Sequence, residues 1–238
     1  MNVMNEQSIE GLVSDLCESL GYSYCYGPSV VRDGFEQVVL KDILCSAVYR
    51  INSSLPRQVC DEALNKVLRI ASPDVLANNE VFHRMLTEGV SVSSYVEGSE
   101  RGNLVWLVDF ENIENNDFVV VNQFTIVENG RNKRPDVLLF VNGLPLVVIE
   151  LKNAADENAT IQSAFRQIET YKEIIPSLFT YNALVVISDG LEARAGSMSA
   201  GFSRMMAWKT SDGKAEASHL IGQLEDLVKG MLNKETLL

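Results

Sequence analysis

The chain has 238 residues, of which 46% are hydrophobic and 22% are charged, proportions ordinary for a soluble globular protein of one or two domains. Its formal net charge of −12 argues against broad nonspecific affinity for nucleic acid, because phosphate neutralisation needs clustered Lys and Arg. No run approaches the roughly 18 apolar residues of a membrane span, and the acidic start lacks a secretory signal. We therefore expect a cytoplasmic protein that makes no membrane contact.

Two residue types that are common in metal and nucleophile sites are scattered along this chain. The cysteines contain no CxxC pair and predict reduced, partly buried thiols rather than disulfides or zinc ligands: Cys17, Cys25, Cys45 and Cys60. His83 and His219 stand far apart and outside any HExxH sequence. A histidine-based metal site or a Ser-His-Asp triad is therefore poorly supported.

Helical patterns dominate the first ninety residues. Apolar residues at helical spacing predict a helix over 5–20 that ends at Gly21. Further helical patterns follow at 36–52, 57–70 and about 74–88. The period then changes, and segments rich in Val, Ile, Phe and Trp predict three strands, at 91–97, 103–110 and 118–127.

Two nearly uninterrupted apolar runs form the most informative part of the sequence. Residues 136–141 (DVLLFV) and 146–152 (LVVIELK) are joined by Asn142-Gly143, a strong signal for a β-hairpin. Continuous apolar strands are buried on both faces. We therefore expect these two strands at the centre of a sheet.

The remaining elements complete an alternating pattern. A helix is predicted over 159–175, a buried strand over 183–188 and a C-terminal helix over about 217–233. When residues 40–110 are set aside, the order is helix, strand, strand, strand, helix, strand. This order predicts an α/β fold with a central mixed sheet flanked by helices, and a helical insertion at about 36–90.

Charged residues stand at the ends of the two apolar runs, where burying charge is costly. Asp136 opens the first run, while Glu150 and Lys152 end the second and, being two apart in a strand, project from one face. Two converging carboxylates can hold a divalent cation, and an ammonium beside them can meet an anionic substrate. Phosphodiester hydrolysis needs this set. The spacing alone favours a solvated strand end with a Glu–Lys pair slightly over a metal site.

Two further groups of residues could serve a nucleic-acid substrate. Gln167 and Tyr171 lie at i and i+4 on one helical face, where they could bind DNA backbone oxygens or brace the site, although such pairs are usually incidental. Arg131, Lys133 and Arg134 form a small basic cluster beside Asp136. This cluster fits either DNA contact or a solvated turn.

The register of the hairpin decides whether the two carboxylates can meet. A regular loop of two residues, Asn142-Gly143, would set Asp136 opposite Ile149 and leave Glu150 on the other face. A shared metal site therefore requires either a loop with an odd number of residues or a β-bulge. Pro145 lacks the N–H of a regular ladder and favours an irregularity near the turn.

Together these residues have a family resemblance. Pro135-Asp136, Glu150-x-Lys152 and Gln167-x-x-x-Tyr171 resemble the PD-(D/E)xK nucleases, in the branch with a QxxxY helix shared with RecB-like nucleases. Residues 132–154 (NKRPDVLLFVNGLPLVVIELKNA) are similar to the N-terminal nuclease domain of the R (restriction) subunit of type I restriction-modification enzymes. Further similar stretches are 114–128, 155–172 and 175–196, so that the resemblance runs from about residue 5 to 210.

The resemblance implies a restriction-endonuclease-like core in an endonuclease domain over 1–215, with its catalytic part at about 103–190. Residues 216–238 would then form a helix that leads to a helicase-like motor. No stretch matches the P-loop pattern GxxxxGK[ST]. We therefore expect a segment of a longer subunit, in which ATP is bound elsewhere, and a natural single-domain protein is the less favoured alternative.

The resemblance also assigns roles to individual residues. Asp136 and Glu150 would hold Mg²⁺, with the backbone carbonyl of Leu151 as a third ligand. Lys152 would be the catalytic lysine. Gln167 and Tyr171 would form the helix motif that supports cleavage. DNA contact by Arg131, Lys133 and Arg134 is expected from their charge and not from the resemblance.

A glutamate of the first helix often joins the site in this family. Glu6 and Glu10 are both candidates, and Glu10 better continues the helix. The function implied is metal-dependent endonucleolytic cleavage of double-stranded DNA, together with methylase and specificity subunits. A RecB-like repair nuclease is an alternative that the long similar stretches disfavour. A catalytically silent module that docks DNA or another subunit is a second alternative, disfavoured because every motif residue is present.

Overall fold

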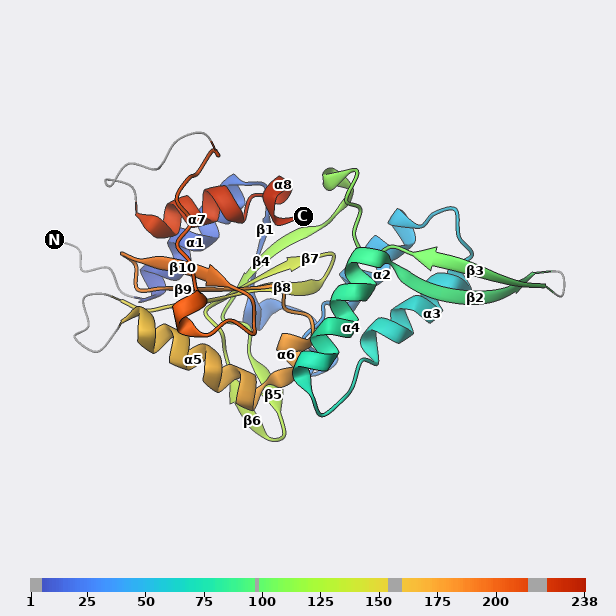
Figure 1. Cartoon of the computed structure of the whole chain (residues 1–238), viewed down its shortest axis with the longest axis horizontal. Helices are drawn as coiled ribbons and strands as arrows, with labels where there is room; N and C mark the ends of the chain where they lie inside the picture. The colour runs from blue at the N-terminus through green and yellow to red at the C-terminus, as the bar shows by residue number, and fades with distance from the viewer. Residues whose placement is uncertain (1–5, 97–98, 154–159, 214–221) are drawn as a thin grey trace.

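The computed structural model describes residues 6–96, 99–153, 160–213 and 222–238, and shows one mixed sheet with helices on both faces (Figure 1). The sheet has six strands in the order β1-β4-β7-β8-β9-β10. The strands, in that order, are Ser23–Tyr26, Phe118–Asn122, Val137–Val141, Leu144–Leu151, Leu184–Ser188 and Ala193–Gly196. The α/β fold with a central mixed sheet is confirmed.

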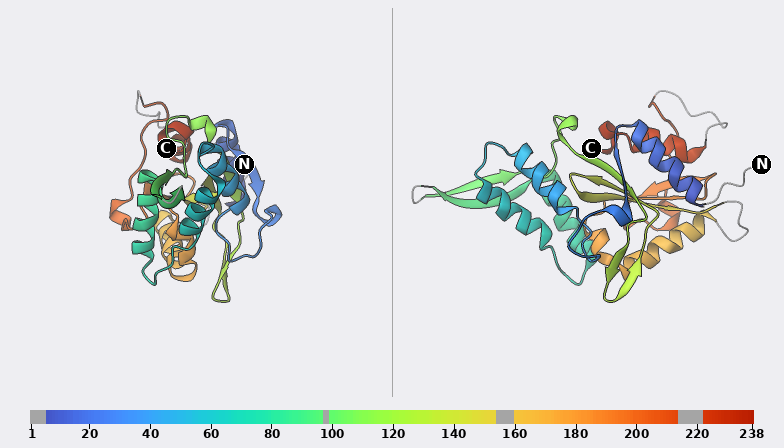
Figure 2. Two further views of the ribbon diagram at one scale, coloured as in Figure 1. Left: turned by 90° about the vertical axis from the view of Figure 1, so that its right-hand side faces the viewer. Right: turned by 180° about the vertical axis from the view of Figure 1, so that it is seen from behind.

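Helices cover both faces of this sheet. Helices α1 (Glu6–Ser19) and α7 (Gln223–Met231) lie on one face and α5 (Ile161–Ile174) lies on the other, as two opposite views show (Figures 1 and 2). Every residue of β7 and β8 is buried, which is why both strands are apolar without alternation. Their predicted central place is confirmed.

The hairpin of β7 and β8 has a two-residue turn and a bulge. Asn142 and Gly143 form the turn with φ values of 50° and 79°, the positive values that such tight turns need. The register shifts between Leu139 and Phe140, which leaves Leu146 as an extra residue on β8. The predicted irregular register is therefore confirmed, and of the two predicted forms the bulge is correct and the odd loop is wrong.

Contacts with the next strand hold the bulge in place. The carbonyl oxygen of Leu146 accepts hydrogen bonds from the N–H of Ala183 at 2.7 Å and from the side chain of Asn182 at 3.1 Å. Pro145, the preceding residue, has no N–H to contribute to a regular ladder. Hydrogen bonds from the two residues just before β9 thus stabilise the extra residue.

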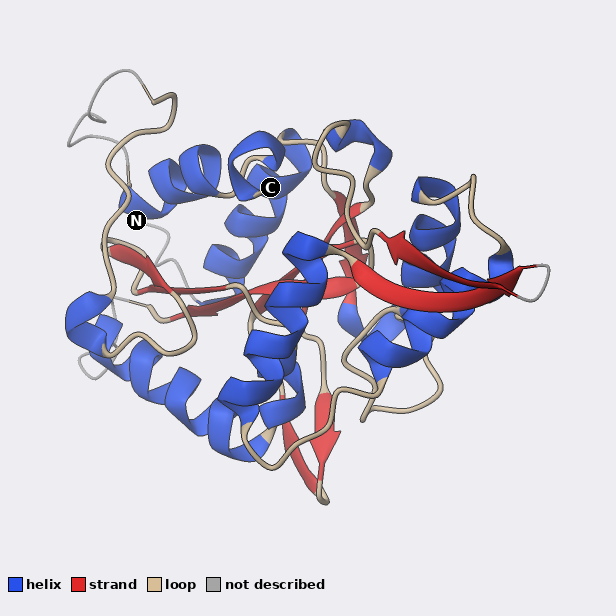
Figure 3. Cartoon of the chain, turned by 45° about the vertical axis from the view of Figure 1, so that its right-hand side comes forward, coloured by secondary structure: helices blue, strands red, loops and turns tan. Residues whose placement is uncertain are grey.

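A lobe is inserted between β1 and β4 and extends away from one end of the sheet (Figures 1 and 3). This insertion lobe contains α2 (Lys41–Ile51), α3 (Arg57–Leu68), α4 (Val75–Glu88) and the hairpin of β2 (Val90–Val96) with β3 (Ser99–Val105). The predicted helix over 36–52 starts too early, because the N–H of Leu40 donates to the carbonyl of Gly143 and keeps this stretch on the sheet. The strand predicted over 103–110 is displaced, since the hairpin ends at Val105.

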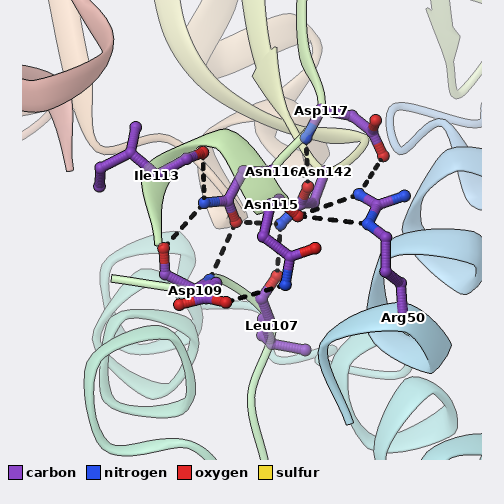
Figure 4. Close-up of polar contacts among 8 residues, drawn as sticks. All are labelled: Arg50, Leu107, Asp109, Ile113, Asn115, Asn116, Asp117 and Asn142. Atoms are coloured by element: carbon purple, nitrogen blue, oxygen red, sulfur yellow. Dashed lines mark hydrogen bonds and ion pairs between the residues drawn. The ribbon is translucent and has the colours of Figure 1, made fainter. Parts of the chain in front are cut away.

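A buried polar network joins the insertion lobe to the turn of the central hairpin (Figure 4). Asn142, which is completely buried, accepts from the N–H of Asp117 at 2.7 Å and donates to the carbonyl of Leu107 at 2.9 Å and to Asn116 at 2.8 Å. Arg50 of α2 closes the network with an ion pair to Asp117 at 2.7 Å. The turn is therefore fixed by side chains from both parts of the molecule.

The prediction of one strand over 118–127 is wrong, because this segment forms two strands. Strand β4 ends at Asn122, and Gln123 has a left-handed φ of 57°. Strand β5 (Ile126–Glu128) then pairs with β6 (Arg131–Lys133) in a separate two-stranded ribbon. Phe124 and Ile126 are both buried, so the apolar pattern continues across the break and hides it.

Short elements complete the described chain. These are α6 (Pro176–Thr180) and α8 (Lys234–Leu237), with 3₁₀ turns at Gly27–Ser29, Ile113–Asn115 and Phe202–Arg204. All four cysteines are free, as predicted. No helix in the described ranges combines the length and apolar character needed to cross a membrane. The predicted division between residues 215 and 216 lies outside the described residues and stays a prediction.

Candidate active site

Three neighbouring strands bring polar residues side by side at the end of the sheet opposite the insertion lobe. Val137 pairs with Ile149 beyond the bulge, so the next position outward sets Asp136 beside Glu150. On the other side of Asp136, the N–H of Gln123 donates to its carbonyl at 3.2 Å. The bulge therefore gives Asp136 and Glu150 the common face that a regular hairpin would deny them.

Asp136 has a partly buried carboxylate, and its surroundings disfavour the ionised form. Burial, together with the negative charge of Glu150, raises its pKa from 3.8 to about 8, against the opposing effects of the N–H of Leu151 and the ammonium of Lys152. That N–H donates to Asp136 Oδ2 at 2.7 Å. Near neutral pH, the metal-free site therefore favours a protonated Asp136, and a divalent cation would reverse this preference.

Glu150 is almost completely buried, with 1% of its surface exposed. Lys152 Nζ lies 2.6 Å from its Oε1, and the hydroxyl of Tyr171 donates to its Oε2 at 2.9 Å. Lys152 also donates to the carbonyl of Leu151 at 3.0 Å. Both oxygens of the carboxylate are thus oriented by defined donors.

Helix α5 presents Tyr171 to the site from the other face of the sheet. The helix starts at a capping box, in which Thr160 and Ser163 bond each other's backbone, and packs through the buried Ile161 and Ile168. Tyr171 lies on the same buried face, where burial and then the charge of Glu150 raise the pKa of its phenol. Tyr171 points toward the carboxylates, as predicted.

Gln167 precedes Tyr171 by one helical turn, and its side chain lowers the pKa of the Tyr171 phenol against the larger effects of burial and of Glu150. Phe165, two residues before Gln167, is half-buried and packs edge-on against Phe202. Of the two residues of the predicted helix motif, Tyr171 is the one that contacts Glu150.

Helix α1 contributes Glu10, which is 5% exposed. Its two oxygens accept hydrogen bonds from the side-chain amide of Gln123 at 2.8 and 2.6 Å, and its negative charge adds to those that raise the pKa of Asp136. The side chain of Glu6, the other candidate, lies outside the described residues. Gln123 was not predicted as a site residue, and the only signal for it was a polar residue inside an apolar run.

The sequence matches one known protein family over most of its length. The family described as "Type I restriction enzyme R protein N terminus" matches residues 3–204. The chain belongs to this family. It is 39% identical to the type I restriction enzyme HindI endonuclease subunit of Haemophilus influenzae, over 99% of this chain and 23% of that protein.

Two other relatives of the R protein N terminus are similar over shorter stretches. The putative MjaIXP endonuclease subunit of Methanocaldococcus jannaschii is 33% identical over 84% of this chain and 20% of that protein. The EcoprrI endonuclease subunit of Escherichia coli is 36% identical over 62% of this chain and 47% of that protein. The chain thus spans about a fifth to a quarter of the length of the first two relatives.

The predicted basic cluster of this R protein N terminus lies next to the carboxylates. Arg131 and Lys133 belong to β6, and Arg134 follows directly, with both arginines exposed. The carbonyl of Arg134 lies 3.3 Å from the hydroxyl of Tyr171. The cluster is therefore on a strand and its continuation rather than in a turn, and its contact with DNA stays a prediction.

The donors at this site suit a hard divalent cation. Two carboxylates side by side and the carbonyl of Leu151 are oxygen ligands, and Mg²⁺ is usually held by one or two carboxylates together with water and substrate phosphate. Among the described residues, no three Asp, Glu, His or Cys side chains are grouped closely enough to enclose an ion. The residues therefore fit an open magnesium site and do not form a closed structural one.

Proposed function

We propose that this chain is the nuclease part of a type I restriction enzyme R subunit and that it cleaves double-stranded DNA with Mg²⁺ as its cofactor. Membership of the R protein family supports the subunit assignment, and the relatives' names support an endonuclease. The observation that carries the proposal is the bulged register, which sets Asp136 beside Glu150 with Lys152 on the same carboxylate.

Each residue of the site has a distinct task in this proposal. Asp136, Glu150 and the Leu151 carbonyl hold the cation, which polarises the phosphoryl oxygen and lowers the pKa of a bound water. Lys152 brings an ammonium next to the scissile phosphate, where developing negative charge needs a partner. Tyr171 fixes the orientation of Glu150 through its hydrogen bond.

The position of the site at one end of the sheet suits a polymeric substrate. A hollow of about 460 Å³ on the described surface is lined by residues of the 33–41 loop, α3 and α6, and not by the carboxylate residues. Arg131, Lys133 and Arg134 supply positive charge at this end of the sheet, but the net charge of −12 keeps the affinity of this part for DNA weak. In the longer cytoplasmic enzyme, an ATP-driven motor and methylase and specificity subunits deliver the DNA.

The test uses the complete R subunit assembled with its methylase and specificity subunits. Asp136→Asn and Lys152→Ala should each lower DNA cleavage by about a hundredfold or more, while ATP hydrolysis and translocation continue. Lys66→Ala is the matched control, because Lys66 also pairs with a glutamate, Glu62, but lies in the insertion lobe. Near-normal cleavage by either site variant would contradict the proposal.

A further inference from the structure

Gln123 stands in a backbone conformation that a glutamine rarely adopts. Its φ of 57° is in the left-handed region, which side chains with a Cβ avoid unless their surroundings enforce it. The residue sits where β4 ends and the chain turns away into the ribbon of β5 and β6. Such conformations cluster at functional sites, so the neighbours that enforce this one are informative.

Three contacts hold Gln123 in this conformation. Its N–H donates to the carbonyl of Asp136, and its side-chain amide donates to both oxygens of Glu10. On the remaining side, a Cβ on Gly27 would lie 2.5 Å from the carbonyl oxygen of Gln123, so only glycine allows the 3₁₀ turn after β1 to approach this closely. The backbone is therefore fixed, and the direction of the side chain is fixed with it.

The partner of this amide is a buried carboxylate beside the proposed cation site. Glu10 is 5% exposed, and it comes from α1, on the face of the sheet opposite α5. A neutral amide orients a carboxylate without cancelling its charge, whereas a lysine or arginine at the same place would compete with a cation for it. Glu10 is thus held in one orientation by the amide of Gln123.

We propose that Gln123 is a positioning residue that orients Glu10 beside the cation site of Asp136 and Glu150, so that the carboxylate of α1 adds its charge to this site without being a third ligand. This inference rests on the proposed metal-dependent function. It assigns Gln123 a role through Glu10 alone: the glutamine contacts neither the cation nor DNA. Two consequences follow, namely that removal of the amide weakens cation binding and that it does so only while Glu10 is present.

The experiment measures Mn²⁺ binding to this 238-residue chain by calorimetry and the Mg²⁺-dependent rise of its melting temperature. Gln123→Gly keeps the left-handed backbone and removes the amide, so the metal-free melting temperature should stay within about 2 °C of the parent. Its Mn²⁺ affinity should fall by about tenfold, the scale of one hydrogen bond to a charged group. Asn129→Gly is the matched control, since Asn129 is an exposed residue with φ 51° in the β5–β6 turn, and it should bind as the parent does.

A double variant separates positioning from a merely structural role. Glu10→Gln should weaken binding, and Glu10→Gln combined with Gln123→Gly should bind no more weakly than Glu10→Gln alone, because the amide acts through that carboxylate. An unchanged affinity in Gln123→Gly, or losses that simply add in the double variant, would overturn the inference. If the parent does not bind Mn²⁺ saturably, or if Asp136→Asn binds as tightly as the parent, the metal site of the proposed function fails and the inference fails with it.

Discussion

The two ends of the β7–β8 hairpin are built from the same buried strands but differ in how their polar groups are partnered. At the turn, Asn142 is completely buried among neutral partners, and its side chain meets matched donors and acceptors on Asp117, Leu107 and Asn116. At the open end, carboxylates and a lysine are crowded together with burial working against their charges. The turn is arranged for stability, and the open end for a charged ligand that is not part of the chain.

Two aspartates show the same contrast. The pKa of Asp109, near the turn, is lowered by the side chain of Asn115 and by backbone N–H groups that favour its ionised form. The pKa of Asp136, at the open end, is raised by burial and by the charge of Glu150. Hydrogen-bond donors favour the ionised form of Asp109, whereas burial and the charge of Glu150 disfavour the ionised form of Asp136. The environment of each carboxylate, and not its residue type, therefore sets its pKa.

The largest expected effect on stability is at the turn. Asn142→Ala removes hydrogen bonds to three buried groups and places an alanine at a φ of 50°. It should lower the free energy of unfolding by about 3–4 kcal/mol, measured by urea denaturation. Asn129→Ala, with a similar φ of 51° but an exposed side chain, should lose only about 1 kcal/mol. Equal losses in the two variants would show that backbone strain and not the network stabilises the turn.

The open end should behave in the opposite way, gaining stability when its charge is removed. Between pH 3.8, the ordinary pKa of Asp136, and about 8, its folded value, the unfolded chain releases the proton while the folded chain keeps it. The stability from this group is therefore complete below pH 3.8 and is lost as the pH rises to 8. Asp136→Asn avoids this loss and should be about 1–3 kcal/mol more stable than the parent at pH 8 in EDTA.

The gain should shrink steadily when the same denaturation is repeated toward pH 5. Added Mg²⁺ should stabilise the parent and not Asp136→Asn, because the cation replaces the missing positive charge. A gain that is independent of pH would mean that the carboxylate of Asp136 is not the destabilising group.

A substitution of Tyr171 separates the effect of one hydrogen bond on stability from its effect on DNA cleavage. Tyr171→Phe should cost about 1 kcal/mol of stability and lower DNA cleavage by the complete enzyme by about tenfold, because Glu150 loses one orienting donor. Tyr181→Phe removes a comparable buried hydroxyl, which donates to the carbonyl of Val67 at 3.1 Å. It should cost similar stability and leave cleavage unchanged; equal cleavage by the two variants would deny Tyr171 a role in the site.

The smallest effect is expected for the ion pair at the turn. The side chains of Arg50 and Asp117 are 39% and 41% exposed, whereas those of Lys152 and Glu150 are 21% and 2% exposed. Arg50→Ala should therefore cost only about 0.5 kcal/mol, and less in 1 M salt. A loss above about 2 kcal/mol, measured by urea denaturation, would show that the network depends on the arginine and not on its asparagines.

The sequence predicted best where one local pattern decides the outcome. The centre of the sheet follows from uninterrupted apolar runs, and α5 follows from its helical spacing, so these elements were placed within a few residues. The edge strands β1 and β10 were missed, because each has only four residues and depends on pairing with a neighbour for its conformation. Tertiary contacts, and not propensity, define such strands.

The residues of the candidate site show the same division between those that a local pattern predicts and those that tertiary contacts place. Asp136, Glu150 and Tyr171 could be named in advance, because a motif fixes their spacing and the register argument required a bulge between the two acids. Gln123 could not, because its place depends on a left-handed backbone and on the close approach of Gly27 in the 3₁₀ turn after β1. Neither feature leaves a periodic trace in the sequence.

The extra residue, Leu146, changes the number of positions that separate opposed residues of the hairpin. With a two-residue turn, opposed residues are separated by an odd number of positions, as Val141 and Leu144 are. Beyond one inserted residue the intervals become even, and Asp136 and Glu150 fall in that class. The parity of the interval between the two acids therefore records the bulge, and deletion of Leu146 alone would turn the acids to opposite faces while leaving every residue of the site in the chain.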